Sequence, residues 1–559
     1  MSINACNILL GGEAGQGLVT VGNLLAKILV RHGYYIVVTE SYQSRIRGGH
    51  NTFSIRVSAD PITASQDKVD LLVALNAQTV TIDGGTLSDT GTIVTDEAFG
   101  VTCDRCLQAP YRQLASARYA NTVALGLAAS LLGLSQDICS EAVREAFGRK
   151  GPEVIEENLQ ALAGAYQWSA GKSTPCPGLP KISAPEKRLV MNGNDAIALG
   201  ALSAGIKFYS FYPMTPSTSI GLVLAANAAR MGMVVEQAED EIAAINMAIG
   251  ASFAGAPSMV STSGGGFALM VEGVSLAAMT ETPLVIAVGQ RPAPATGLPT
   301  RTEQSDLEFV LHSGHGEFPR AIFAPGSVED CFFLTRRAFE IAEHSQSPVF
   351  ILFDQFLADS QRAVKPFDLA GLPPIEVGAR PDGVKTPYRR FELTADGVSP
   401  RLFPGMGEHL VIADSDEHTE DGHITEDLSI RKAMVEKRLA KLEWIRSQAT
   451  PPSFAGDESP DILLVTWGST FGAALEAVET MRSRGRKAAL LNFSQVWPLV
   501  PQQFMDKLKG AKEVVGVEGN ATAQFARLIR RETGFEIART ILRYDGLPIT
   551  PEWILREIK

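Results

Sequence analysis

The sequence contains few cysteines, and their spacing excludes several kinds of metal site. Six cysteines occur among 559 residues, and Cys103 and Cys106 form the only CxxC pair. One pair cannot supply the four ligands of a structural zinc ion or of an iron–sulfur cluster. We therefore predict no metal site on this chain. Reduced thiols are the expected state, and a transient redox role for this pair is the alternative.

A basic excess and long apolar runs are also absent. The formal net charge is −12 and the sequence pI is about 5.3, which argues against a nucleic-acid-binding surface. No run of about 18 uncharged apolar residues could span a membrane. The N-terminus, MSINACNILLGGEAGQG, lacks the basic and apolar regions of a signal peptide. These absences predict a cytoplasmic protein with neither a nucleic-acid nor a membrane partner.

What the sequence does contain is an alternation of short apolar runs and helix-patterned stretches. At about 100–200 residues per domain, the length predicts three or four domains. Strands alternating with helices predict an α/β fold with mostly parallel sheets. We predict an α/β domain at 1–172, a proline-rich linker at 173–187 and a second α/β domain at 188–365. An irregular segment with a charged helix at 366–455 and a third α/β domain at 456–559 complete the chain.

The same patterns predict individual elements. In the first domain we expect strands at 7–10, 35–39, 71–75 and 91–95, and helices at 18–31, 121–133 and 138–147. In the second we expect strands at 207–211, 233–236, 258–262, 284–288 and 349–353. The charged helix should span about 429–447, and the last domain should have strands at 461–466, 487–492 and 514–518.

A glycine-rich turn, GGEAGQG at 11–17, follows the first predicted strand. Backbone N–H groups and the dipole at the start of a helix favour an anion at such a place. The turn matches neither GxGxxG nor GxxxxGK[ST], so it is either a tight turn or a phosphate cradle. A later loop, SYQSRIRGGH at 41–50, carries Arg45 and Arg47. These arginines either hold phosphate or carboxylate groups or form a solvated basic loop.

A stiff loop, YPMTPST at 212–218, follows a predicted strand of the second domain. Its two prolines restrict the backbone, and its hydroxyl groups precede the next helix, where Ser217 could be the N-cap. About twenty residues later, Glu241 begins a helix of small and apolar residues. A carboxyl group at that junction should be buried and should have a raised pKa.

Together, these strings resemble the 2-oxoacid:ferredoxin oxidoreductases. YPMTPST is similar to their YPITP loop, with Met214 in place of the common isoleucine, which conserves volume. The stretch 239–251 is similar to their activating-glutamate helix, STSGGG at 261–266 to a loop of the thiamine pyrimidine domain, and GLPTRTEQ at 297–304 to a segment of the 2-oxoglutarate-type alpha subunits. GGEAGQG and RIRGGH resemble the gamma domain of the family, and QVWPL at 495–499 and VEGNAT at 517–522 resemble its transketolase C-terminal-like domain. The likeness covers almost the whole chain, as a gamma–alpha fusion.

The resemblance implies a thiamine-diphosphate enzyme that oxidatively decarboxylates a 2-oxoacid with coenzyme A, or runs the reverse carboxylation of the reductive TCA cycle. The preferred substrate is 2-oxoglutarate, giving succinyl-CoA; pyruvate and branched-chain 2-oxoacids are alternatives. Glu241 would be the catalytic glutamate that hydrogen-bonds the aminopyrimidine ring. Thr215 and Arg301 would hold the substrate carboxylate, with Arg291 as the second choice of arginine.

Two further sets of residues follow from the resemblance. Cofactor contacts are expected from Tyr212, Pro213, Glu241 and Gly265. Coenzyme A contacts are expected from Gly12, Gly15, Gly17, Arg45 and Arg47.

The resemblance also implies that this chain is an incomplete enzyme, whose active site forms only together with another subunit. It has no GDG signature of a diphosphate–magnesium site and no cluster-binding cysteines. We therefore expect Mg and a 4Fe-4S iron–sulfur cluster on a beta subunit, which would also dock ferredoxin, in an (alpha-beta)2 heterotetramer. A stand-alone thiamine decarboxylase or transketolase and a non-catalytic nucleotide-binding module are the alternatives. The missing diphosphate motif counts against the former, and the failed GxGxxG match counts against the latter.

Overall fold

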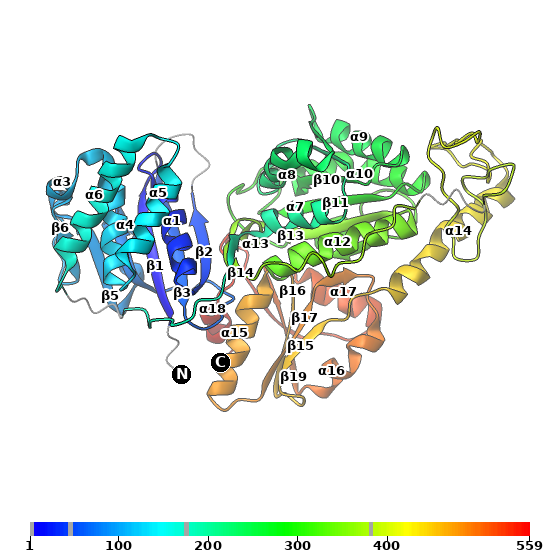
Figure 1. Cartoon of the computed structure of the whole chain (residues 1–559). Coiled ribbons are helices and arrows are strands. Elements are labelled where there is room, and N and C mark those ends of the chain that lie inside the picture. Colours follow the sequence, from blue (N-terminus) through cyan, green and yellow to red (C-terminus); the bar gives the residue numbers. More distant parts are fainter. Residues whose placement is uncertain (1–4, 43–48, 173–177, 379–383, 559) are drawn as a thin grey trace. The chain divides into compact units, whose positions relative to one another are not determined.

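The computed structural model describes residues 5–42, 49–172, 178–378 and 384–558. Internal contacts divide the chain into two compact units (Figure 1). The first unit comprises residues 1–192, 359–367 and 550–559, and the second comprises residues 193–358 and 368–549. Helices and strands alternate in both units, which confirms the predicted α/β class.

The first unit contains an eight-stranded sheet in the order β6-β5-β4-β1-β3-β2-β14-β7. Its strands are β1 (Ala5–Glu13), β2 (Tyr35–Ser41), β3 (His50–Ser58), β4 (Val69–Ala74), β5 (Leu87–Asp96), β6 (Cys106–Ala109), β7 (Leu189–Met191) and β14 (Gln361–Val364). The strands β1, β4, β5 and β6 are parallel neighbours. Between β1 and β2 lies β3, antiparallel to both, which the sequence analysis did not predict.

Four helices of the first unit share one core with the sheet: α1 (Leu18–Arg31), α4 (Ala120–Leu131), α5 (Gln136–Phe147) and α6 (Pro152–Ser169). The predicted helix at 18–31 is confirmed with the same bounds. It forms because apolar residues recur every three or four positions and give one buried face, which includes Leu18, Leu25 and Ile28. The shorter helices are α2 (Ala77–Asp83), α3 (Tyr111–Leu114) and α18 (Pro551–Glu557).

The second unit contains a seven-stranded sheet in the order β18-β12-β13-β11-β10-β8-β9. Its strands are β8 (Phe208–Phe211), β9 (Val234–Gln237), β10 (Ser258–Ser263), β11 (Leu284–Gln290), β12 (Ala321–Phe323), β13 (Pro348–Asp354) and β18 (Gln495–Trp497). All neighbours are parallel except β18, which runs antiparallel to β12. The helices are α7 (Gly193–Ser203), α8 (Thr218–Met231), α9 (Glu241–Phe253), α10 (Gly264–Met279), α11 (Leu307–Leu311), α12 (Val328–Ser345), α13 (Gln355–Asp359) and α14 (Leu428–Ser447). The strands and the charged helix predicted here are confirmed within two residues.

A five-stranded sheet in the order β15-β17-β16-β19-β20 completes the second unit. Its strands are β15 (Ser453–Gly456), β16 (Ile462–Trp467), β17 (Ala488–Phe493), β19 (Glu513–Glu518) and β20 (Arg539–Leu542), and its helices are α15 (Thr470–Ser483), α16 (Met505–Gly510) and α17 (Gln524–Thr533). Buried side chains of α9 and α10, such as Ile245 and Phe267, share one core with Trp467, Leu491 and Phe525 of this sheet and its helices. The two sheets of the second unit are therefore held together by a common apolar core.

The cysteines correct one expectation. Cys103 and Cys106 form a disulfide rather than two reduced thiols, because the turn before β6 brings their Cα atoms to 5.3 Å, within bonding range. Cys6, Cys139 and Cys331 are free and buried, and Cys176 lies outside the described residues. Within the described ranges, no group of three or more His, Cys, Asp or Glu residues is arranged to hold a metal ion. No helix in the described part of the chain is long and apolar enough to cross a membrane.

Candidate active site

The parallel strands of the seven-stranded sheet end at one edge, and the residues that follow them carry the candidate site. The YPMTPST loop follows β8, Glu241 follows β9, Gly265 follows β10, and Arg291 and Arg301 follow β11. Ligands of parallel α/β sheets bind at the carboxyl ends of the strands. The topology therefore brings these candidates, predicted from separate strings of the sequence, to the same edge.

Glu241 is the first residue of α9, and it is buried as predicted. Asp240 is the N-cap, and its carboxylate accepts a hydrogen bond from the backbone N–H of Ala243 at 2.7 Å. The side chain of Asp240 thus starts the helix, which leaves Glu241 free to point elsewhere. Glu241 is only 3% exposed, and its Oε1 is buried without a hydrogen-bond partner. Burial raises the pKa of Glu241, and the nearby charge of Asp240 raises it further.

The glycines at the start of α10 allow the helix to approach this carboxyl group. A Cβ at Gly266 would clash with the carboxyl oxygen of Glu241 and with the hydroxyl of Thr262. Any larger residue at this position would displace one of the two groups. The structure thus combines a buried, unpartnered carboxyl oxygen with a glycine that leaves room beside it. An unpartnered buried oxygen is costly, and such groups are typical of ligand sites.

The YPMTPST loop is held in place by hydrogen bonds to its backbone. Asn194 Nδ2 donates to the carbonyl of Pro216 at 2.7 Å, and Arg291 Nη1 donates to the carbonyl of Thr215 at 2.8 Å. Ser217 stands before α8, but its hydroxyl donates to the carbonyl of Met214 at 3.0 Å and does not cap the helix. The loop therefore keeps Thr215 half-buried, while Tyr212 is 40% exposed.

The two candidate arginines have different surroundings. Arg291 is half-buried and contacts the backbone of Thr215, so these two residues are brought together. Burial lowers the pKa of Arg291, and the carboxylate of Asp306 opposes this effect. Arg301 is also half-buried, and its side-chain stem lies beside Gly546, in the turn after β20. Arg291 therefore has a contact that fixes the loop, whereas Arg301 packs against the turn after β20.

Two further polar residues at this edge were missed by the sequence analysis. Asp306 Oδ2 and Gln290 Nε2 are buried without hydrogen-bond partners, and the backbone N–H of Asp306 donates to Gln290 Oε1 at 3.0 Å. Burial raises the pKa of Asp306 to about 6; the charge of Glu303 adds to the shift, and that of Arg291 opposes it. A Cβ at Gly264 would clash with the Asp306 carboxylate. The one feature of the sequence that could have indicated Asp306 is its position directly after the GLPTRTEQS segment.

The glycine-rich segment at 11–17 was predicted to be a turn between a strand and a helix, but its first three residues belong to the end of β1, and the turn to α1 begins after Glu13. Gly15 and Gly17 have φ angles of 99° and 75°, in the left-handed region that favours glycine. The side chain of Gln16 closes the turn, since its Oε1 accepts a hydrogen bond from the backbone N–H of Glu13 at 2.7 Å. Gly12 packs against Gln16 and Leu75. Arg45 and Arg47, predicted as further coenzyme A contacts, are outside the described residues.

Comparison with protein families gives two matches in this chain. Residues 199–437 match the family described as pyruvate flavodoxin/ferredoxin oxidoreductase, thiamine diP-bdg. Residues 7–168 match the pyruvate ferredoxin/flavodoxin oxidoreductase family. The first match contains every candidate residue of the second unit, and the second contains the glycine turn.

Comparison with individual proteins extends over nearly the full length. The chain is 31% identical to the 2-oxoacid:ferredoxin oxidoreductase subunit alpha of a Sulfolobus species, over 97% of this chain and 94% of that protein. It is 30% identical to the 2-oxoglutarate oxidoreductase subunit KorA of Mycobacterium tuberculosis, over 99% and 91% of the two chains. A solved structure, 2-oxoglutarate:ferredoxin oxidoreductase from Magnetococcus marinus with 2-oxoglutarate, coenzyme A and succinyl-CoA bound, is 31% identical, covers 99% of both chains and has a TM-score of 0.94. Sequence, fold and site geometry agree, and the chain belongs to the alpha subunits of the thiamine-diphosphate-dependent 2-oxoacid:ferredoxin oxidoreductases.

Proposed function

We propose that this chain acts on 2-oxoglutarate, forming succinyl-CoA and passing electrons to ferredoxin, or catalysing the reverse carboxylation. Support comes from the similarity to the Mycobacterium tuberculosis 2-oxoglutarate oxidoreductase subunit and to the Magnetococcus marinus 2-oxoglutarate:ferredoxin oxidoreductase. The Sulfolobus relative carries only the general name. Pyruvate and branched-chain 2-oxoacids are therefore the substrates against which 2-oxoglutarate must be tested.

The observation that carries the proposal is the buried Glu241 carboxyl group. Its unpartnered Oε1 and the room that Gly266 leaves beside it fit the aminopyrimidine ring of thiamine diphosphate, with Tyr212, Pro213 and Gly265 as further contacts. When bound, the cofactor supplies a nucleophilic carbon in its thiazolium ring. Burial raises the pKa of Glu241 and so favours the protonated form of its carboxyl group. It can then hydrogen-bond a ring nitrogen of the pyrimidine.

The substrate carboxylate would be held by Thr215 and Arg301. Arginine is suited to this role because its guanidinium group binds a carboxylate through two parallel hydrogen bonds. Arg291 already donates to the carbonyl of Thr215, so its role in this proposal is to fix the loop that presents the threonine hydroxyl. It remains the alternative ligand of the substrate carboxylate.

Coenzyme A would be bound by the first unit, through the turn that contains Gly12, Gly15 and Gly17 and through Arg45 and Arg47. The turn presents backbone N–H groups at the start of α1, where an anion is stabilised. The arginines would add charge-assisted hydrogen bonds to the phosphates.

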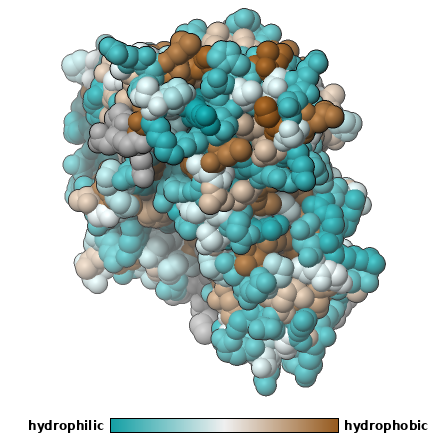
Figure 2. All heavy atoms as spheres, turned by 90° about the vertical axis from the view of Figure 1, so that its right-hand side faces the viewer, coloured by the Kyte–Doolittle hydropathy of each residue, from teal (hydrophilic) through white to brown (hydrophobic). Residues whose placement is uncertain are grey.

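A beta subunit would supply the diphosphate–magnesium site, the 4Fe-4S cluster and the ferredoxin-docking surface. Six large apolar side chains on α8, β9, α9 and α10 are more than a third exposed: Leu222, Met231, Val234, Ile242, Met247 and Leu269. Large apolar patches on a protein surface mark interaction sites, and these elements adjoin Glu241. On the face drawn in Figure 2, apolar side chains are interspersed among hydrophilic ones. The net charge of −12 disfavours direct docking of an acidic ferredoxin on this chain, and two-fold symmetry would give an (alpha-beta)2 complex.

The test is reconstitution with the partner chain. The purified alpha–beta complex should reduce ferredoxin only when a 2-oxoacid and coenzyme A are both present. The ratio kcat/KM should be higher for 2-oxoglutarate than for pyruvate, 2-oxobutyrate and branched-chain 2-oxoacids. A higher kcat/KM for one of these competitors would overturn the substrate assignment, and full activity of the single chain would overturn the need for a partner.

A further inference from the structure

The segment that carries Arg301 is fastened to the five-stranded sheet of the second unit. The backbone N–H of Thr302 donates to the carbonyl of Gly546 at 3.2 Å, and a Cβ at Gly546 would lie 3.1 Å from the Cβ of Arg301. The side chain of Thr302 makes a further contact, because its Oγ1 accepts a hydrogen bond from the backbone N–H of Phe356 at 3.2 Å. The residue next to Arg301 is therefore held by two separate segments of the chain.

Gln304 makes the largest number of these anchoring contacts, and it is only 2% exposed. Its backbone N–H donates to the carbonyl of Gly519 at 2.6 Å, while its Oε1 accepts from the N–H of Gly519 at 2.8 Å. Its Nε2 donates to the carbonyl of Trp467 at 3.0 Å. Gly519 directly follows β19, and Trp467 is the last residue of β16. The side chain of Gln304 thus connects the carboxyl ends of β16 and β19 through hydrogen bonds.

The surroundings of Gln304 are shaped to its side chain. A Cβ at Gly468 would lie 2.8 Å from Gln304 Nε2, and one at Gly519 would lie 3.2 Å from its Oε1. The absence of side chains at Gly468 and Gly519 therefore leaves the space that the amide group of Gln304 occupies. A buried amide with both its oxygen and its nitrogen bonded is a rigid anchor, because breaking either bond leaves a buried polar group unpaired.

From these contacts we propose that Gln304 is a positioning residue that sets the location of Arg301 and thereby the affinity for the substrate carboxylate. This inference rests on the proposed role of Arg301. Arg301 is half-buried, and its long side chain can reach a fixed point only if its backbone is fixed. Gln304, three residues away, supplies that constraint without touching the substrate.

The variant Gln304→Met tests the inference in the alpha–beta complex, because methionine keeps the volume but loses both side-chain hydrogen bonds. A shift of about 1 Å in a binding group can cost up to ~10²-fold, so we expect the KM for the 2-oxoacid to rise roughly tenfold or more. The KM for coenzyme A and the affinity for thiamine diphosphate should not change. Gln304→Glu should behave like the wild type at low pH, where a neutral carboxyl group can make both hydrogen bonds, and should lose substrate affinity as the pH rises.

Gln346→Met is the matched control. Gln346 is another buried amide, 3% exposed, that donates to Ser399 at 2.7 Å and accepts from Arg390 at 2.9 Å, away from the strand ends of the site. It should lower thermal stability and leave the KM for the 2-oxoacid unchanged.

Measuring Arg301→Ala in parallel separates the two claims. If Arg301→Ala leaves the KM for the 2-oxoacid unchanged, the proposed role of Arg301 fails, and the inference fails with it. If Arg301→Ala raises that KM but Gln304→Met does not, only the inference is overturned. A rise of all KM values together in Gln304→Met, or the same rise in Gln346→Met, would also overturn it. Should Gln304→Met not fold, the pH profile of Gln304→Glu decides: a pH-independent KM contradicts the inference.

Discussion

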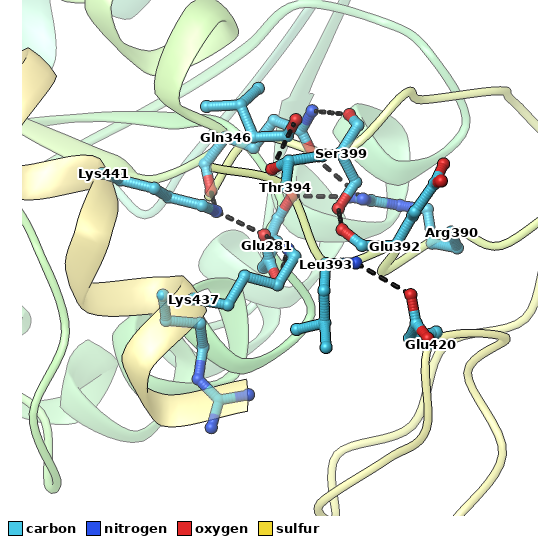
Figure 3. A network of polar contacts seen from close by, with 12 residues as sticks. Glu281, Gln346, Arg390, Glu392, Leu393, Thr394, Ser399, Glu420, Lys437 and Lys441 are labelled. Carbon is cyan, nitrogen blue, oxygen red and sulfur yellow. Dashed lines mark hydrogen bonds and ion pairs between the residues drawn. The ribbon is translucent and has the colours of Figure 1, made fainter. Parts of the chain in front are cut away.

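Replacing Glu281 with glutamine would remove the carboxylate that faces two buried lysines. Figure 3 shows Lys437 and Lys441 reaching from α14 to this side chain. Lys437 Nζ lies 2.6 Å from Glu281 Oε1, and Lys441 Nζ lies 2.5 Å from Oε2. All three side chains are at most 2% exposed. Arg390 adds a third buried cation and donates to the backbone carbonyl of Glu281 at 2.7 Å.

The cost of Glu281→Gln follows from leaving these cations without their countercharge. Removing one partner of a buried ion pair costs about 3–5 kcal/mol, which corresponds to a fall in Tm on the order of 5–10 °C for a domain of this size. The lysines hold the pKa of Glu281 far below its usual range, although burial alone would raise it. The carboxylate is therefore charged throughout the working pH range, and the variant loses a full charge.

The loss of stability in Glu281→Gln should depend on pH, because burial lowers the pKa of Lys441 from 10.5 to about 7. Between these values the folded protein binds fewer protons than the unfolded chain, so the contribution of Lys441 to stability rises with pH in this window. With this pKa, Lys441 is mostly charged near pH 6 and mostly neutral near pH 9, so fewer buried charges depend on Glu281 at the higher pH. The destabilisation should therefore be largest near pH 6 and smaller near pH 9.

Thermal unfolding of the wild type, Glu281→Gln and Glu420→Gln at these two pH values checks the prediction. Glu420 belongs to the same network and accepts from Arg389 at 2.8 Å, but its side chain is 28% exposed. Its substitution should cost only about 1 kcal/mol or less. Equal losses of stability in the two variants, or a loss for Glu281→Gln that is as large at pH 9 as at pH 6, would show that the buried cations do not determine the cost of the substitution.

Three further predictions concern the site. Gly266→Ala should weaken thiamine diphosphate binding, because the new methyl group must displace the Glu241 carboxyl group; titration of the complex with the cofactor measures this, and unchanged affinity would count against the fit. Arg301→Ala should raise the KM for the 2-oxoacid at least about tenfold, since a charge-assisted hydrogen bond contributes roughly 1.5–3 kcal/mol; if Arg291→Ala alone does so, the arginines are wrongly assigned. Arg47→Glu should raise the KM for coenzyme A and spare decarboxylation, and unaltered coenzyme A kinetics would argue for a different binding surface.

Local sequence patterns predicted the helices and strands whose formation does not depend on pairing with a distant part of the chain. The helix at 18–31 was predicted with its observed bounds because its apolar spacing specifies one buried face by itself. The strand β3 was missed, since its place between β1 and β2 depends on pairing with residues up to about fifty positions away. The charged pattern of α14 predicted a helix correctly, but it gave no sign that Lys437 and Lys441 are buried.

The sequence also predicted residues of the candidate site, but not the contacts between them. The burial of Glu241 followed from the small apolar residues after it, which mark a helix packed inside the unit. The contact between Arg291 and the carbonyl of Thr215 joins residues 76 positions apart, and only the parallel order of β8, β10 and β11 brings them together. The anchoring of Gln304 at Gly519 and Trp467 depends on the packing of the two sheets of the second unit. Sequence motifs indicated which residues to consider, whereas their mutual contacts required the fold.

We propose that Glu241 activates the cofactor, and the rate of hydrogen exchange at the thiazolium C2 of bound thiamine diphosphate reports on this role. In the alpha–beta complex, Glu241→Gln should slow this exchange by about 10²-fold or more, the usual contribution of a positioned proton-transfer group. The affinity for thiamine diphosphate should stay close to that of the wild type, because glutamine keeps the shape of the side chain. Exchange at the wild-type rate in Glu241→Gln would rule out this role of Glu241.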